Sequence, residues 1–118
     1  MKTLVVGVSL GADRYANMAC RSLVERGHET IGLGLREGET DGVQVVTGEP
    51  KLADIDTITL YVNPTRQAAM IEYLLSLEPR RVIFNPGTEN AAFAERARQV
   101  GIDPIEACTL VMLASNQF

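Results

Sequence analysis

TITLYVNP, from Thr57 to Pro64, shows the pattern from which the architecture is inferred: a run of strand-forming residues that stops at Asn-Pro. RVIFNPGT, from Arg81 to Thr88, repeats it. Because the residue before a proline is held in the extended region, each strand must end at its asparagine. Asparagine is a good helix N-cap and proline suits the first helical position, so we expect a helix to begin at both junctions. Helix N-termini at the carboxyl ends of strands favour anion binding, and phosphate in particular.

Strand and helix patterns alternate along the rest of the chain. The expected strands are 2–8, 28–34, 43–47, 57–62, 80–84 and 104–107; the expected helices are 14–26, 64–77 and 90–100, and 108–114 is an apolar segment of open type. This alternation predicts an α/β fold, a Rossmann-like, doubly wound parallel sheet with strand order 3-2-1-4-5-6. Helices on both faces would make it a three-layer α/β/α structure, with strand 43–47 at one edge.

Length and composition narrow the class of protein. The chain has 118 residues, 46% hydrophobic and 22% charged, which predicts one globular domain over residues 1–118. A net charge of -4 argues against a nucleic-acid or membrane-surface binder held by bulk charge. Cys20 and Cys108 are far apart in the sequence, and no histidine lies near either of them, so no metal site is expected. Two cysteines without a disulfide pattern fit a reducing cytoplasm, which is the expected location.

The segment after the first expected strand is rich in small residues. Gly7, Ser9 and Gly11 complete only half of a dinucleotide-binding fingerprint. Gly7 permits a tight turn and Ser9 offers a hydroxyl to a phosphate oxygen, although small residues also close a strand-to-helix turn without any ligand. The same spacing matches a serine-hydrolase nucleophile elbow, but the only histidine, His28, is expected at the opposite edge of the sheet. No catalytic residue is therefore assigned.

Three arginines follow expected strand ends. Arg36 stands where NAD-binding enzymes place an acidic residue, and it suits a phosphorylated ribose, as in NADP or coenzyme A (CoA). Arg14 and Arg66 would lie on the same rim, where guanidinium groups bind phosphate well. Each also fits a solvated surface position. Tyr15, beside Arg14, offers a ring to cover an adenine or a pantetheine arm.

The second Asn-Pro junction continues with Gly87, which allows close backbone approach, and Thr88, which offers a hydroxyl and a cap. Glu89 is expected to be structural, because a carboxylate is awkward beside a phosphate. Cys108 would face the cleft if it ended the last strand, but a small buried residue is the stronger expectation.

As a set, these motifs resemble the small bacterial CoA-binding domain proteins, stand-alone relatives of the CoA-binding domain of the succinyl-CoA synthetase alpha subunit. The resemblance covers nearly the whole chain. It rests on 7–9 with 14–15, on 26–29, on 56–64, on 81–90 and on 108–113.

The resemblance implies that CoA lies across the carboxyl edge of the sheet. By position, Gly7, Ser9 and Arg14 would meet the phosphates, Leu35 and Arg36 would lie near the adenosine, and Asn63, Pro64, Asn85, Pro86 and Gly87 would flank the pantetheine. Many members carry Val-Asn-Pro where this chain has Gly34-Leu35-Arg36, so the adenosine contacts and the choice of ligand are expected to be the points at which this chain departs from the family.

The function expected first is a non-catalytic CoA- or acyl-CoA-binding module. An NADP-binding oxidoreductase-type domain or subunit is the alternative, motivated by Arg36. A third possibility is a nucleotide-sensing or scaffold protein that acts through a partner, with the apolar end from Leu110 to Phe118 as a surface for a homodimer or another protein.

Overall fold

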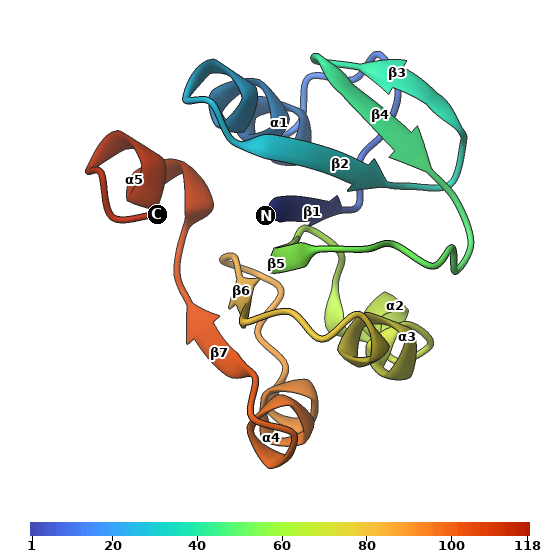
Figure 1. Ribbon diagram of the computed structural model, residues 1–118, viewed down its shortest axis with the longest axis vertical. Helices are drawn as coiled ribbons and strands as arrows, with labels where there is room; N and C mark the ends of the chain where they lie inside the picture. The colour runs from blue at the N-terminus through green and yellow to red at the C-terminus, as the bar shows by residue number, and fades with distance from the viewer.

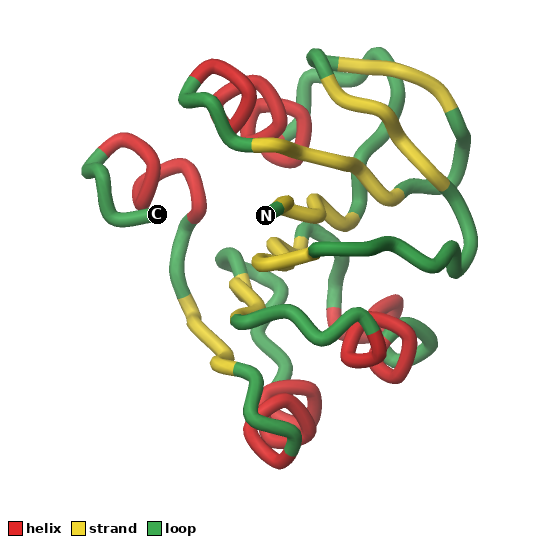
Figure 2. Tube along the Cα trace, in the orientation of Figure 1, coloured by secondary structure: helices red, strands yellow, loops and turns green.

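The computed structural model describes residues 1–118 as a seven-stranded sheet with helices on both faces (Figures 1 and 2). The strands are β1 (Lys2–Val6), β2 (Glu29–Leu33), β3 (Gly38–Thr40), β4 (Val43–Val46), β5 (Ile55–Leu60), β6 (Arg81–Phe84) and β7 (Asp103–Glu106). The helices are α1 (Tyr15–Glu25), α2 (Pro64–Gln67), α3 (Ile71–Ser76), α4 (Ala91–Gln99) and α5 (Thr109–Ala114).

The order across the sheet is β3-β4-β2-β1-β5-β6-β7, and every pairing is parallel except β3 with β4. If β3 is set aside, the remaining strands stand in the expected order 3-2-1-4-5-6, which confirms the doubly wound sheet. Strand β4 was expected at the edge, and this is wrong, because β3 pairs along its outer side.

Two hydrophobic layers separate the sheet from its helices, as the alternation of side chains along β1 requires. On one face Val5 packs with Ala16 and Leu23 of α1 and Leu113 of α5. On the other face Leu4 and Val6 belong to a larger cluster with residues of α3 and α4, including Leu74, Leu75, Phe93 and Ala97. The three-layer arrangement is thereby confirmed.

The hairpin of β3 and β4 was missed by the sequence analysis, which placed no strand between the expected strands 28–34 and 43–47. Its turn is Asp41-Gly42, with φ angles of 53° and 81°. Two consecutive positive φ values are typical of a type I′ turn, for which Asp-Gly is a preferred dipeptide. That dipeptide was the overlooked signal.

The expected helix 64–77 is interrupted. Met70 N–H donates to the carbonyl of Gln67, three residues back, at 2.8 Å, and this tight turn separates α2 from α3. The side-chain amide of Gln67 is buried and donates to the carbonyls of Val62 and Thr88, both at 2.8 Å. Gln67 therefore ties α2 to the segments that follow β5 and β6.

The expectation that a helix begins at the second Asn-Pro junction is also wrong. Thr88 N–H donates to Asn85 O at 2.9 Å, and Gly87 between them has φ 91°. Proline followed by a residue of positive φ is characteristic of a type II turn. Helix α4 begins later, at Ala91, with Asn90 as its N-cap.

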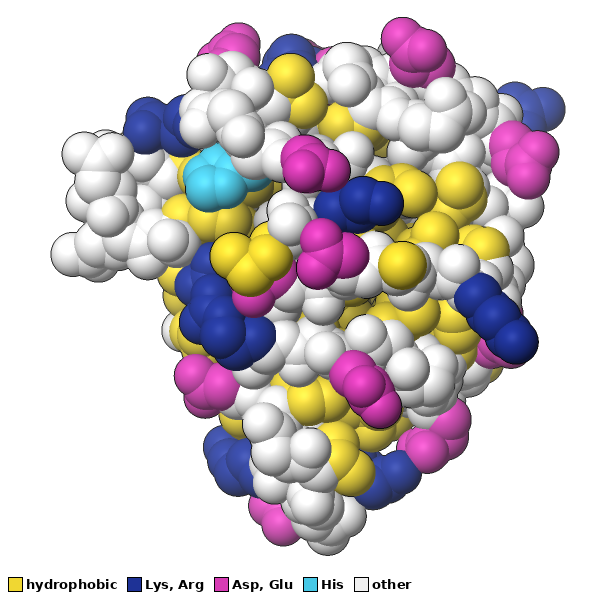
Figure 3. All heavy atoms as spheres, viewed as in Figure 1, with side chains coloured by type: hydrophobic (Ala, Val, Ile, Leu, Met, Phe, Trp, Pro, Cys, Tyr) yellow, Lys and Arg dark blue, Asp and Glu magenta, His cyan; other side chains and the backbone are white.

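None of the helices is long and apolar enough to cross a membrane. The face of the molecule in Figure 3, which carries His28, has acidic and basic side chains interspersed and no continuous basic patch.

Candidate functional site

A cavity of about 1050 Å³ opens at the carboxyl ends of the neighbouring strands β1 and β5. The chain continues from β1 to β2 on one side of this point and from β5 to β6 on the other side. Its walls come from the segments that follow β1, β2, β5 and β6, together with the start of α1. All these segments follow the carboxyl ends of parallel strands. In doubly wound sheets such a point of reversal is the usual ligand-binding crevice.

Two glycines allow the walls to approach one another. Gly7 has φ 106°, and a Cβ atom there would lie 2.9 Å from Val62 Cγ1. A Cβ atom at Gly34 would lie 2.2 Å from the carbonyl oxygen of Val8. Any larger residue at either position would push the segment after β1 away from its neighbours.

Three arginines without ion-pair partners surround the cavity. Arg14, Arg36 and Arg66 all line it and are exposed. The arginines that form ion pairs are Arg21, Arg80, Arg96 and Arg98, and none of these lines the cavity. In a chain of net charge -4, the free guanidinium groups at the cavity form a local positive field suited to an anion with several charges.

The rim also exposes apolar side chains. Leu35 is 81% exposed and Tyr15 is 70% exposed, and both line the cavity with Met18. An apolar surface beside a group of arginines matches a ligand with both a flat apolar part and anionic parts.

At the first Asn-Pro junction, the side-chain oxygen of Asn63 accepts the backbone N–H of Arg66 at 2.9 Å and caps α2. The expected cap is thus confirmed, and Asn63 and Arg66 line the cavity. At the second junction, Pro86, Gly87 and Thr88 line it. The Gly87 N–H is occupied, because it donates to Glu89 Oε1 at 2.8 Å.

The profile of the CoA binding domain family matches residues 1–114. The chain belongs to this family. A solved structure described as an uncharacterized protein is 44% identical, with a TM-score of 0.94 and coverage of 99% of this chain and 97% of the other. No curated protein matches the chain.

More distant solved structures share the fold alone. A hypothetical protein from Pyrococcus horikoshii OT3 is 22% identical, with a TM-score of 0.86 and coverage of 97% of this chain and 82% of the other. A conserved hypothetical protein from Pyrococcus furiosus is 20% identical, with a TM-score of 0.80 and coverage of 93% and 97%.

Most residues expected at the ligand site of this CoA-binding domain lie together. Those that line the cavity are Gly7, Ser9, Arg14, Tyr15, Leu35, Arg36, Asn63, Arg66, Pro86, Gly87 and Thr88. Pro64 and Asn85 do not line it. The lining residues that the sequence analysis did not select are Val8, Leu10, Asp13, Ala16, Met18, Gly34, Tyr61 and Val62. Each is within three positions of a selected residue, so proximity in sequence was the available signal.

Asn85 is buried among structural partners. Its amide nitrogen donates to Thr59 Oγ1 at 2.6 Å and to Leu60 O at 2.9 Å, while its oxygen accepts Thr109 N–H at 2.8 Å. The side chain thus joins the end of β6 to β5 and α5.

The titratable groups near the cavity offer little for acid–base chemistry. Burial raises the pKa of Tyr61 to about 12, and burial likewise raises the pKa of Cys20 to about 12. Asp13, the carboxylate of the lining, pairs with Arg21 at 3.0 Å. His28 is exposed just before β2 begins, at the amino edge of the sheet, with its ring centroid 5.0 Å from that of Phe118. Cys108 does not line the cavity.

Proposed function

We propose that this protein binds CoA or an acyl-CoA in the cavity at the carboxyl edge of the sheet and catalyses no reaction on it. The observation that carries the proposal is the set of unpaired arginines, Arg14, Arg36 and Arg66, around a cavity in a member of the CoA-binding domain family. CoA carries a diphosphate and a separate 3′-phosphate, so several guanidinium groups spread around one cavity match its charge distribution.

In the proposed complex, Ser9 and Arg14 contact the diphosphate next to the segment after β1. Arg36, which follows β2, contacts the 3′-phosphate, and Leu35 and Tyr15 supply apolar surface for the adenine. The pantetheine arm runs along Pro86 and Gly87. These placements follow the order of the strand ends around the cavity.

The absence of catalysis is supported by the side chains of the lining. Asp13 is held by Arg21, and Tyr61, whose pKa burial raises to about 12, keeps its proton at neutral pH. Ser9 therefore lacks a neighbouring general base such as a nucleophilic mechanism requires.

NADP is the second candidate, favoured by Arg36 alone, because its 2′-phosphate would occupy the same region as the 3′-phosphate of CoA. Isothermal titration calorimetry with CoA, 3′-dephospho-CoA, NADP and NAD separates the candidates. We expect CoA to bind most tightly. The proposal is refuted if CoA gives no heat at millimolar concentration while NADP does.

Arg36→Ala tests the role of this side chain in either complex. It should weaken CoA binding by roughly 10- to 100-fold, the range for a charge-assisted hydrogen bond, and leave the affinity for 3′-dephospho-CoA almost unchanged. Arg98→Ala, which removes an exposed arginine paired with Glu95 on α4, is the control and should alter neither affinity. An equal loss for both ligands with R36A would contradict the assignment to the 3′-phosphate.

A further inference from the structure

The β3–β4 hairpin lies against the segment between β1 and α1. A Cβ atom at Gly38 of β3 would lie 2.8 Å from Leu10 Cδ1. The turn residue Asp41 is mostly buried, with 12% of its side chain exposed, although turn aspartates are usually solvated. The hairpin thus packs on the part of the chain that supplies Ser9 and Arg14 to the cavity.

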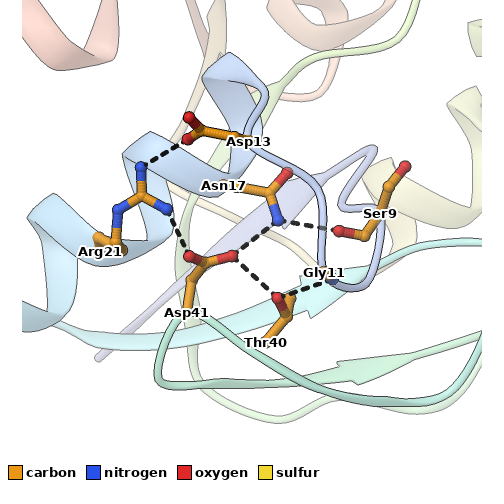
Figure 4. A network of polar contacts seen from close by, with 7 residues as sticks. All are labelled: Ser9, Gly11, Asp13, Asn17, Arg21, Thr40 and Asp41. Atoms are coloured by element: carbon orange, nitrogen blue, oxygen red, sulfur yellow. Dashed lines mark hydrogen bonds and ion pairs between the residues drawn. The ribbon is translucent and has the colours of Figure 1, made fainter.

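Asp41 is the centre of a polar network that reaches this segment (Figure 4). Asn17 Nδ2 donates to Asp41 Oδ2 at 2.7 Å and to the carbonyl of Ser9 at 2.8 Å. Thr40 Oγ1 donates to Asp41 Oδ2 at 2.9 Å and accepts the Gly11 N–H at 3.1 Å. One carboxylate oxygen therefore orients two side chains that fix Ser9 and Gly11.

The other oxygen of Asp41 holds the end of the same segment. Arg21 donates to Asp41 Oδ1 and, through Nη2, to Asp13 Oδ1 at 3.0 Å. Asp13 precedes Arg14, one of the unpaired arginines of the cavity. The network thus holds the segment at Ser9, Gly11 and Asp13.

Between Ser9 and Asp13 the backbone has little support of its own. The internal backbone hydrogen bond in this part is from Ala12 N–H to Ser9 O, and it is long at 3.4 Å. Ordering a segment held this weakly costs conformational entropy when a ligand binds. This cost lowers the affinity for the ligand unless other contacts have already fixed the segment.

We propose that Asp41 is a positioning residue for the ligand site: through Asn17, Thr40 and Arg21 it fixes residues 9–13 in the conformation that receives the phosphates. The proposal rests on the proposed function, since it assumes an anionic ligand in the cavity. Asp41 itself does not line the cavity, so its effect on the ligand passes through the segment that it holds.

The charge of Asp41 is well maintained in this setting. Burial acts to raise its pKa, but hydrogen bonds from Asn17, Arg21 and Thr40 outweigh burial and hold the pKa below the ordinary value. The carboxylate is therefore ionised at neutral pH and accepts hydrogen bonds on both oxygens.

Asp41→Asn tests the carboxylate while keeping the turn, because Asn-Gly favours a type I′ turn as well as Asp-Gly does. Its matched control is Asp56→Asn. Asp56 is similarly buried, with 17% of its side chain exposed, and accepts from Arg80 and from Thr57, but it lies at the start of β5, away from the cavity. Thr40→Val, which removes only the contacts of the hydroxyl, is the second variant.

The readouts are CoA affinity by calorimetry, unfolding by denaturant, and exchange of the Gly11 amide hydrogen by NMR in the ligand-free protein. We expect D41N to weaken CoA binding roughly tenfold and D56N less than twofold, with similar losses of stability in the two variants. Gly11 exchange should be faster in D41N and T40V and unchanged in D56N.

The two proposals fail separately. If wild-type protein binds CoA and D41N binds it equally well, the positioning role is overturned. If D56N weakens CoA binding as much as D41N, the effect is one of general stability and the positioning role is again overturned. If the wild type does not bind CoA, the proposed function fails. Unchanged Gly11 exchange in D41N and T40V would refute the claim that Asp41 and Thr40 fix residues 9–13, whether or not CoA binds.

Discussion

The two Asn-Pro junctions carry the same dipeptide at the ends of neighbouring parallel strands, yet they form different structures. At the first, Asn63 is exposed and caps α2. At the second, Asn85 is buried, and Pro86-Gly87 form the centre of a turn. Gly87 accounts for part of the difference, because it takes the positive φ that a type II turn needs at that position. Partners from β5 and α5 account for the rest, since they occupy the whole amide of Asn85.

The largest expected contrast is between the two asparagines themselves. Asn85→Ala leaves the buried N–H of Thr109 and the carbonyl of Leu60 without their partner, so we expect it to lower the free energy of unfolding by about 3 kcal/mol. Urea denaturation measures the change. If N85A lost no more stability than Asn63→Ala, the buried network would not distinguish the junctions.

Gly87→Ala tests the turn. We expect a loss of about 1–2 kcal/mol, because alanine is disfavoured at positive φ while a Cβ atom there meets no neighbour within 4 Å. Gly48→Ala is the matched control, with φ 73° and equally open surroundings away from the cavity. The two should lose similar stability, and only G87A should also weaken CoA binding. Equal CoA affinity for both variants would remove this turn from the ligand site.

The smallest expected effect is at the first junction. Asn63→Ala removes one exposed capping hydrogen bond and should lower the free energy of unfolding by about 1 kcal/mol or less. Asn63→Asp, which keeps an accepting oxygen, should restore the lost stability in the same denaturation experiment. A loss as large as that of N85A would mean that Asn63 has structural partners beyond its cap.

Much of the candidate site follows from the order of the strands. Once β1, β2, β5 and β6 are placed side by side in parallel, the residues that come after them must meet at one edge of the sheet. For this reason Ser9, Arg36, Asn63 and Gly87 were selected correctly as neighbours around one cavity, although their roles toward a ligand remain predictions. Asn85 and Pro64 were selected by the same rule, but the direction of a side chain after a strand depends on the local turn.

The sequence by itself determined the alternation of strands and helices, the order of the parallel strands and the position of three arginines after strand ends at one edge. These features depend on hydrophobic periodicity, proline and glycine chemistry, and chain connectivity, all of which are local. Only the tertiary structure decided that Asn85 is a buried link, that β3 completes the sheet, and that Asp41 reaches back to the segment after β1. Each depends on hydrogen bonds between residues distant in sequence, such as the contact of Thr40 with Gly11, and no local pattern specifies such partners.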